Sequence, residues 1–253
     1  MTLPSSAVLS PAAFVAAVAL IMLLSCAVAA LAGFGGNLLA IPPLAAVCGD
    51  LWPAVVLVLL IGTLQSLVMA AGNARAVRWR ALGALAGWSA LGVPLGRALT
   101  HWLPQQPLEL AMGLVILVGA AAGHLQMHDD GAERPLSAGS RLLLLGAGIM
   151  HGAFGCGGPT VVLAARGHLR DKDAFRATLF AFWIVLNGFA LATMAGRLTA
   201  PGLPLLAVIG LPCMMAGSWL GQRLAARVNQ KRFGELVAAM LALTGLVTII
   251  RAL

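Results

Sequence analysis

Charged residues are scarce in this sequence. They make up 9% of its 253 residues, whereas 60% are hydrophobic. A soluble domain carries about 25% charged residues, so this chain cannot cover a surface that faces water. Apolar runs of membrane-spanning or nearly spanning length recur along it: Pro11–Gly33, Pro53–Gly72, Leu203–Gly221 and Glu235–Ile250. The sequence therefore predicts an all-α polytopic membrane protein.

Other absences exclude further classes. Aromatic residues are few (6%) and alternating ten-residue strands are missing, which excludes an outer-membrane barrel. Cys26, Cys48, Cys156 and Cys213 show neither CxxC spacing nor paired histidines, so a disulfide framework or zinc site has little support. Gly-Lys-Ser/Thr is absent, and we expect no nucleotide, metal or other cofactor. No Lys or Arg precedes Arg75, so the N-terminal segment is interpreted as a retained helix rather than a signal peptide.

The charges that are present give a net charge of +8. The cations fall almost entirely between the apolar runs, where they act as topology signals and contact anionic membrane lipid rather than nucleic acid. No Asp or Glu lies deep in an apolar run, which argues against a carboxylate-based cation or proton pathway.

The chain repeats itself. Gly33-Phe34-Gly35-Gly36-Asn37, the first glycine motif, returns as Gly155-Cys156-Gly157-Gly158-Pro159, the second glycine motif. At the same offset Gln65 corresponds to Asn187, and Gly92-x-x-x-Gly96 is followed later by Gly217-x-x-x-Gly221. The sequence predicts a single membrane domain, 1–253, with halves 11–123 and 141–253 and a polar linker 124–140. The expected apolar elements are about 11–47, 53–72, 81–100 and 107–123, then 141–167, 174–196, 203–222 and 234–250.

The cations bear on topology. If all these elements cross the membrane, the sixteen Lys and Arg residues divide almost evenly between its sides. If each glycine motif is instead the tip of a re-entrant hairpin, thirteen share one face and only Arg97, Arg197 and Arg251 lie opposite. The positive-inside rule favours the hairpins, which make the halves inverted repeats with periplasmic termini. A broken but spanning helix fits the lengths almost as well.

The glycine motifs predict a buried site. Irregular backbone at membrane depth must be surrounded by protein or line a cavity. Gly35 and Gly36 in one half, and Gly157 and Gly158 in the other, supply unrestricted φ and close approach. Pro159 suits a first helical turn and Asn37 can cap one. Two helix starts would then favour an anion. Alternatively, the glycines serve only close helix packing, as the two Gly-x-x-x-Gly pairs are expected to do.

Further polar groups are candidates for this cavity. Gln65 and Asn187 could bond substrate or join helices, and Thr160 could donate a hydroxyl. His151 could couple protons or be a packing histidine. Cys156 could act on a sulfur substrate or be a small apolar filler.

Glycine motifs on the first element of each half, with about eight apolar elements in some 250 residues, resemble the sulfite exporter TauE/SafE family (TSUP). The resemblance extends from about Ala12 to Ile249. It implies a multi-pass cytoplasmic-membrane transporter of small, often sulfur-containing anions such as sulfite and sulfonates. The first motif ends in Asn where the second ends in Pro. The resemblance is therefore not used to assign a particular substrate to this chain.

The leading prediction is a secondary transporter of a small anion, its site formed by two facing half-helix tips. A sulfur-handling membrane enzyme using His151 and Cys156 is the alternative, although no third catalytic partner is evident. A passive anion channel is another. The sequence leaves open the substrate, the direction of transport, the coupling ion and the oligomeric state. A homodimer is one candidate for the last.

Overall fold

Helices make up most of the described part of the protein, and short turns and loops join them. The structure is a computed structural model, and it describes residues 10–99, 110, 114, 117, 135–199 and 202–252. The first half contains α1 (Pro11–Ala32), α2 (Gly36–Cys48), α3 (Leu51–Gly72), the 3₁₀ turn η1 (Ala74–Ala76) and α4 (Trp79–Leu99). The second contains α6 (Ala138–Phe154), α7 (Gly158–Ala165), α8 (Lys172–Thr193), η2 (Ala195–Arg197), α9 (Leu203–Arg227) and α10 (Gln230–Ala252). From α1 to α4 and from α6 to α9, the two halves show the same order of elements. The fourth expected element, 107–123, lies almost entirely outside the described residues.

Four of the described helices are long and apolar enough to cross a membrane: α1, α3, α8 and α9. Local sequence sets where several of them begin. The side chains of Ser10, Asp50 and Asp171 accept hydrogen bonds from backbone N–H groups in the first turns of α1, α3 and α8. The prediction of an all-α polytopic membrane protein is confirmed.

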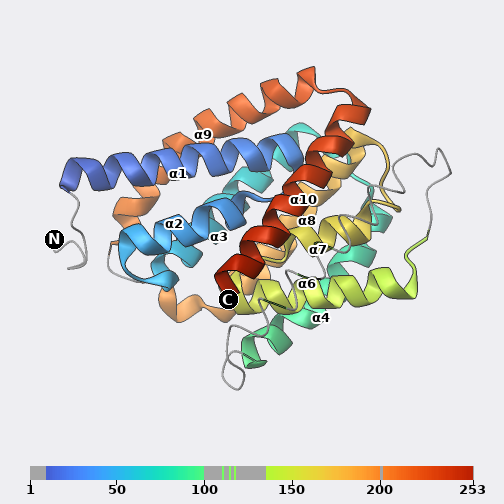
Figure 1. The fold of residues 1–253 in the computed structure, drawn as a ribbon, viewed down its shortest axis with the longest axis horizontal. Coiled ribbons are helices and arrows are strands. Elements are labelled where there is room, and N and C mark those ends of the chain that lie inside the picture. The colour runs from blue at the N-terminus through green and yellow to red at the C-terminus, as the bar shows by residue number, and fades with distance from the viewer. Residues whose placement is uncertain are drawn as a thin grey trace.

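The chain reverses direction at both glycine motifs (Figure 1). Had α1 continued straight, Ser25 and Gly36 would be about 16 Å apart at 1.5 Å per residue. Instead, a Cβ added at Gly36 would lie 3.1 Å from the Ser25 carbonyl oxygen and 2.9 Å from the Ala29 Cβ. In the second half, a Cβ at Gly157 would collide with the Ala147 carbonyl oxygen on α6. Thus α1–α2 and α6–α7 are hairpins, each returning towards the end from which it came.

Each hairpin packs mainly against a helix of the other half. The hairpin helix α1 packs most extensively against α9 of the other half, and α6 packs most extensively against α4. Between these pairs, α3 and α8 pack against each other.

Glycines allow these helices from different halves to pack closely. A Cβ at Gly96 would strike the Ile149 carbonyl on α6, and a Cβ at Gly148 would strike the Ser89 carbonyl on α4. On α9, Gly217 and Gly221 lie against the backbone of α1 in the same way. The prediction that both Gly-x-x-x-Gly pairs serve close helix packing is confirmed.

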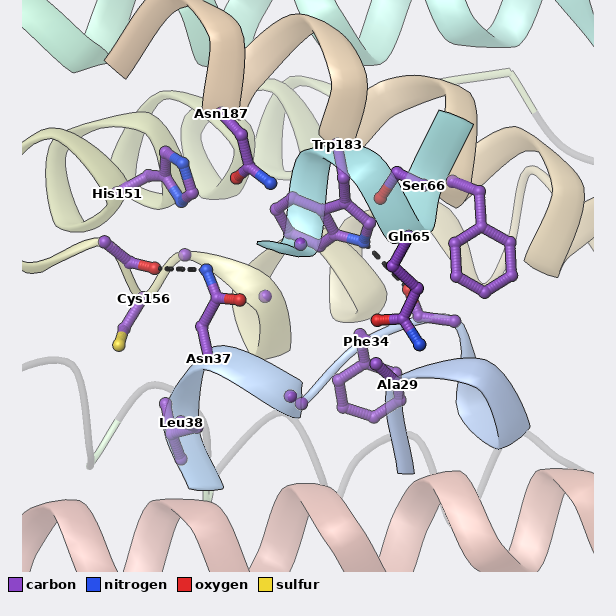
Figure 2. Close-up of a pocket in the computed structure, with 18 of the residues that line it drawn as sticks. Ala29, Phe34, Asn37, Leu38, Gln65, Ser66, His151, Cys156, Trp183 and Asn187 are labelled. Atoms are coloured by element: carbon purple, nitrogen blue, oxygen red, sulfur yellow. Dashed lines mark hydrogen bonds between the residues drawn. The ribbon is translucent and has the colours of Figure 1, made fainter. Parts of the chain in front are cut away.

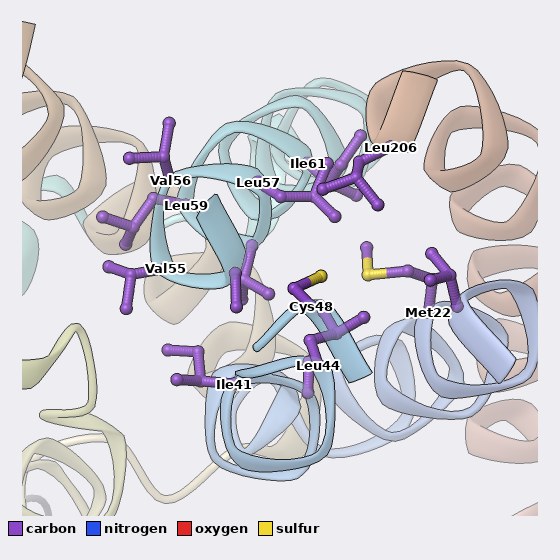
Figure 3. Packing of buried hydrophobic residues seen from close by; sticks show 14 of the residues in the cluster. Met22, Ile41, Leu44, Cys48, Val55, Val56, Leu57, Leu59, Ile61 and Leu206 are labelled. Carbon is purple, nitrogen blue, oxygen red and sulfur yellow. The ribbon is translucent and has the colours of Figure 1, made fainter. Parts of the chain in front are cut away.

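An apolar core fixes the first hairpin to the centre of the protein (Figure 3). Ile41, Leu44 and Cys48 of α2 are buried together with Val55 and Leu59 of α3. Met22 of α1 and Leu206 of α9 complete this part of the cluster. Because α2 is only 13 residues long and contains Pro42 and Pro43, this packing rather than its own propensity holds it in place.

Most of the cations gather at the end of the molecule where α3 and α9 finish and α4, α6 and α8 begin (Figure 1). There Lys172 donates to the carbonyls of Ala225 (3.3 Å) and Val228 (2.9 Å). Away from this group, Arg97 and Arg197 both stack on Trp52, with guanidinium carbons 4.9 and 3.8 Å from the ring centre. Arg223 and Arg227 lie on α9 rather than in a loop after residue 222. Arginine is a good helix former, so α9 continues beyond the end of the apolar run.

Candidate anion site between the two glycine motifs

A cavity of about 40 Å³ lies where the two glycine motifs meet (Figure 2). From the first half, the predicted residues that line it are Gly35, Gly36, Asn37 and Gln65. From the second half they are His151, Cys156, Gly157, Gly158, Pro159 and Asn187. A space of this size holds a few water molecules or a compact anion of about four heavy atoms. Thr160 is buried nearby and does not line it.

The starts of two helices face each other across this cavity. A Cβ at Gly158, the first residue of α7, would lie 3.8 Å from the backbone nitrogen of Gly35, the N-cap of α2. The first N–H groups of a helix have no acceptor within it, and each helix start carries about half a positive charge. Two such starts close together favour the binding of an anion between them.

In the second glycine motif the left-handed backbone conformation occurs at Gly155 and not at Gly157 or Gly158, where it was expected. Positive φ angles are found at Gly33 (84°), Gly35 (89°) and Gly155 (72°), whereas Gly157 has φ −95°. The prediction of special φ at Gly157 and Gly158 is therefore wrong. Gly33 and Gly155 end α1 and α6 with the left-handed cap that commonly terminates helices. Gly157 is needed for close packing against α6.

Asn37 joins the two motifs instead of capping a helix. Gly35 is the N-cap of α2, so the expected Asn37 cap is wrong. The Asn37 Nδ2 donates a 2.8 Å hydrogen bond to the carbonyl of Gly155 (Figure 2). In the repeat Gly155 corresponds to Gly33, whose carbonyl accepts a 2.8 Å bond from Trp183 Nε1. Each helix-ending carbonyl is thus bound by a side chain from the other half.

Gln65 and Asn187 both lie at the cavity, as their repeat positions predict. Gln65 Nε2 donates to the Cys26 carbonyl (2.7 Å) and to Ser218 Oγ (2.9 Å). A carbonyl only accepts, so this bond fixes which end of the amide is the nitrogen. The Asn187 Oδ1 is buried and has no hydrogen-bond partner among the described residues.

His151 is fully buried in the cavity wall. Its ring centre is 5.9 Å from that of Trp183, and neither ring nitrogen makes a hydrogen bond of acceptable geometry within the described part of the chain. Cys156, also in the wall, is partly exposed. Among the described residues no cluster of His, Cys, Asp or Glu could hold a metal ion.

Sequence reasoning missed several residues of this site. Trp183, Phe34, Phe180 and Ser66 also line the cavity, and Ser218 anchors Gln65. Trp183 precedes Asn187 by one helical turn, so the i, i+4 rule could have placed it on the same face. Ser218 lies within the Gly217-x-x-x-Gly221 pair and had no separate signal.

Comparisons with known proteins agree with the membrane architecture. The profile of the family described as "Sulfite exporter TauE/SafE" matches residues 17–248. The "Probable inner membrane transporter protein TsaS" of Comamonas testosteroni is 29% identical over 198 residues, which cover 75% of this chain and 80% of that protein. No solved structure matches the chain. Since the family profile covers nearly the whole chain, this multi-pass membrane protein belongs to the sulfite exporter TauE/SafE family of transporters.

Proposed function

We propose that the protein is a secondary transporter that carries a small sulfur-containing oxyanion, such as sulfite or an organosulfonate, out across the inner membrane. The substrate would bind in the cavity between the two glycine motifs, against the starts of α2 and α7. The Sulfite exporter family and the inner-membrane relative support the substrate class and the location.

The opposed helix starts carry this proposal. Moving a bare ion into hydrocarbon costs on the order of tens of kcal/mol. Unpaired N–H groups at two helix starts replace part of the lost hydration, and their partial positive charges favour an anion over a cation. The 3.8 Å approach of the Gly158 Cβ position to the Gly35 nitrogen brings both starts to the same site.

The packing of α1 against α9 and of α6 against α4 forms two bundles, which supports a mechanism of alternating access. We propose that the halves are inverted repeats, since α1 and α6 run in opposite directions in Figure 1, as do α3 and α8. Rocking of one bundle against the other would expose the cavity to each side in turn.

The cation distribution supports an orientation. We propose that the cation-rich end is cytoplasmic and that both termini are periplasmic. An anion leaving a negative cytoplasm then gains about 2.3 kcal/mol per charge for each 100 mV of membrane potential. Export needs no nucleotide under these conditions.

Transport by purified protein in liposomes tests the proposal. Vesicles loaded with sulfite should release it at a rate that saturates with concentration and shows counterflow. Release without saturation or counterflow would indicate a channel, and chemical turnover of sulfite without net movement would indicate an enzyme. No protein-dependent movement of any small anion would refute the proposed function.

A further inference from the structure

A largely buried arginine, Arg176, lies beside the cavity on the side of the cation-rich end. It is in the second turn of α8, which begins at that end, and its side chain is 14% exposed. A Cβ placed at Gly33, which lines the cavity, would be 3.4 Å from the Arg176 Cα and 3.5 Å from its Cγ. The stem of the arginine therefore packs against the wall of the cavity.

The face of α8 that carries Arg176 leads into the cavity. Phe180, Trp183 and Asn187 follow it at helical spacing, so the four side chains share one face of the helix. The last three line the cavity, and Figure 2 shows Trp183 and Asn187 pointing into it. At a rise of 1.5 Å per residue, Arg176 lies about 6 Å along the helix axis from Phe180. Arg176 is therefore one turn beyond the cavity wall, towards the cation-rich end.

The guanidinium group of Arg176 keeps one donor without a partner. Its Nη2 donates to the carbonyl of Ala30, which is among the last carbonyls of α1 and so has no donor within that helix. This bond caps α1, but the Nε of Arg176 is buried and has no hydrogen-bond partner among the described residues. Every nitrogen of a guanidinium group donates and none accepts, so only an acceptor such as an oxyanion can satisfy Nε.

The charge of Arg176 is weakly compensated. Asp173, one turn earlier on α8, places a carboxylate oxygen 3.8 Å from Nη1, but the Asp173 side chain is 66% exposed. An ion pair with so exposed a partner contributes little stability. Burial of a charge without a close, buried counter-charge is costly, so an anion bound at Arg176 would be favoured.

The other half has no cation at the equivalent position. At the offset that pairs Gln65 with Asn187, Arg176 corresponds to Ala54 of α3. Ala54 is fully buried in an apolar cluster that includes Val55. Both halves contain a hairpin helix that must end at a glycine, so a capping role alone does not explain an arginine in only one of them. A role in substrate entry is needed only on the side from which the substrate comes.

We propose that Arg176 binds the substrate anion at the edge of the cavity, before the anion reaches the starts of α2 and α7. A charged oxygen of the substrate accepts a hydrogen bond from the Arg176 Nε, and the anion then passes Phe180 into the cavity. Sulfite and organosulfonates both present such oxygens. The cation-rich end is the proposed cytoplasmic end, from which an exporter takes up its substrate. This inference rests on the proposed function and identifies the residue that admits the substrate.

Uptake of labelled sulfite and methanesulfonate into membrane vesicles tests the inference. Vesicles that expose the cation-rich end are identified by labelling of Gly167→Cys, so that the substrate meets Arg176 first. Arg176→Gln keeps an N–H donor for Ala30 but removes the charge. Its KM should rise at least about tenfold, while the maximum rate per folded protein changes little. Arg176→Lys keeps the charge, so its KM should lie closer to that of the wild type. An unchanged KM in Arg176→Gln, with or without a lower maximum rate, would show that the arginine only caps α1 and would overturn the inference.

Two exposed residues provide matched tests. Asp173→Asn removes the carboxylate beside Arg176, so its KM should fall by up to about threefold. If Arg176→Gln does not fold, this variant decides, and an unchanged KM overturns the inference. Arg223→Gln removes a cation at the same end that stacks on Trp219, 4.0 Å from its ring centre, and its KM should equal that of the wild type. Equal increases in KM for Arg223→Gln and Arg176→Gln would indicate a general effect of surface charge and overturn the inference.

The wild type separates this inference from the proposed function. If wild-type uptake saturates and the KM does not respond to changes at Arg176 or Asp173, only the role of Arg176 is refuted. If the wild type moves neither sulfite nor methanesulfonate, the proposed function is refuted and the inference with it.

Discussion

The Nδ2 of Asn37 on α2 donates a hydrogen bond to the carbonyl of Gly155, the residue that ends α6 in the other half. Trp183 makes the corresponding bond to Gly33, which ends α1. A carbonyl at the end of a buried helix has no intrahelical partner, so each bond satisfies a group that would otherwise be costly. The two bonds tie the glycine motifs to each other across the cavity.

Removing the Trp183 donor should therefore lower stability. Trp183→Phe keeps an aromatic ring but leaves the Gly33 carbonyl unpaired, and we expect a loss of about 1–3 kcal/mol. For a chain of this size that corresponds to an apparent Tm lower by about 2–12 °C. Thermal unfolding in detergent measures it. Trp79→Phe is the control, because Trp79 is exposed and the change should leave the apparent Tm unaltered.

Gly158→Val tests the anion site itself. A Cβ there meets nothing closer than 3.8 Å and projects between Gly35, Phe34 and Trp183. We expect normal membrane insertion with transport reduced about ten- to a hundredfold, as the loss of a charge-assisted hydrogen bond worth about 1.5–3 kcal/mol would produce. Transport assays in liposomes, normalised to inserted protein, provide the readout. Normal transport by this variant would place the anion site elsewhere.

Neighbouring glycines should behave differently. Gly96→Val places bulk against the Ile149 carbonyl, and Gly157→Ala against the Ala147 carbonyl, so both should reduce the amount of folded protein. Gly36→Val, which repeat symmetry predicts to be a milder version of Gly158→Val, should also impair folding because its Cβ would lie 2.9 Å from that of Ala29. Quantitative expression and gel filtration distinguish these variants from Gly158→Val. If Gly158→Val behaves like Gly96→Val, the second glycine motif is structural.

Single-cysteine labelling tests the orientation. In a background without the four native cysteines, Ala76→Cys and Gly167→Cys should react only with reagents that reach the cytoplasm. Gly196→Cys, in the turn η2 beside Arg197, should react from the periplasm. A Cβ at Gly167 or Gly196 meets no atom within 4 Å, so neither substitution should disturb packing. Labelling of Ala76→Cys and Gly167→Cys from opposite sides would contradict the proposed topology.

The repeat located most of the candidate site from sequence. The offset between the glycine motifs also pairs Gln65 with Asn187, and all of these residues line the cavity. Local patterns could not reveal which glycines adopt positive φ, because that depends on where each helix ends and turns back. Nor could they reveal the roles of Asn37 and Trp183, whose partners lie 118 and 150 residues away in the chain.

The glycine-lined contact between α4 and α6 has a consequence for movement. Gly92, Gly96, Gly148 and Gly152 bring these backbones so close that no Cβ fits between them. Such a contact cannot slide without steric collision, so α4 and α6 should move as one rigid unit even though they come from different halves. The α3–α8 contact includes the cavity and carries larger side chains. We expect a cysteine cross-link between α4 and α6 to leave transport intact and one between α3 and α8 to stop it, which would locate the moving boundary at the centre of the protein.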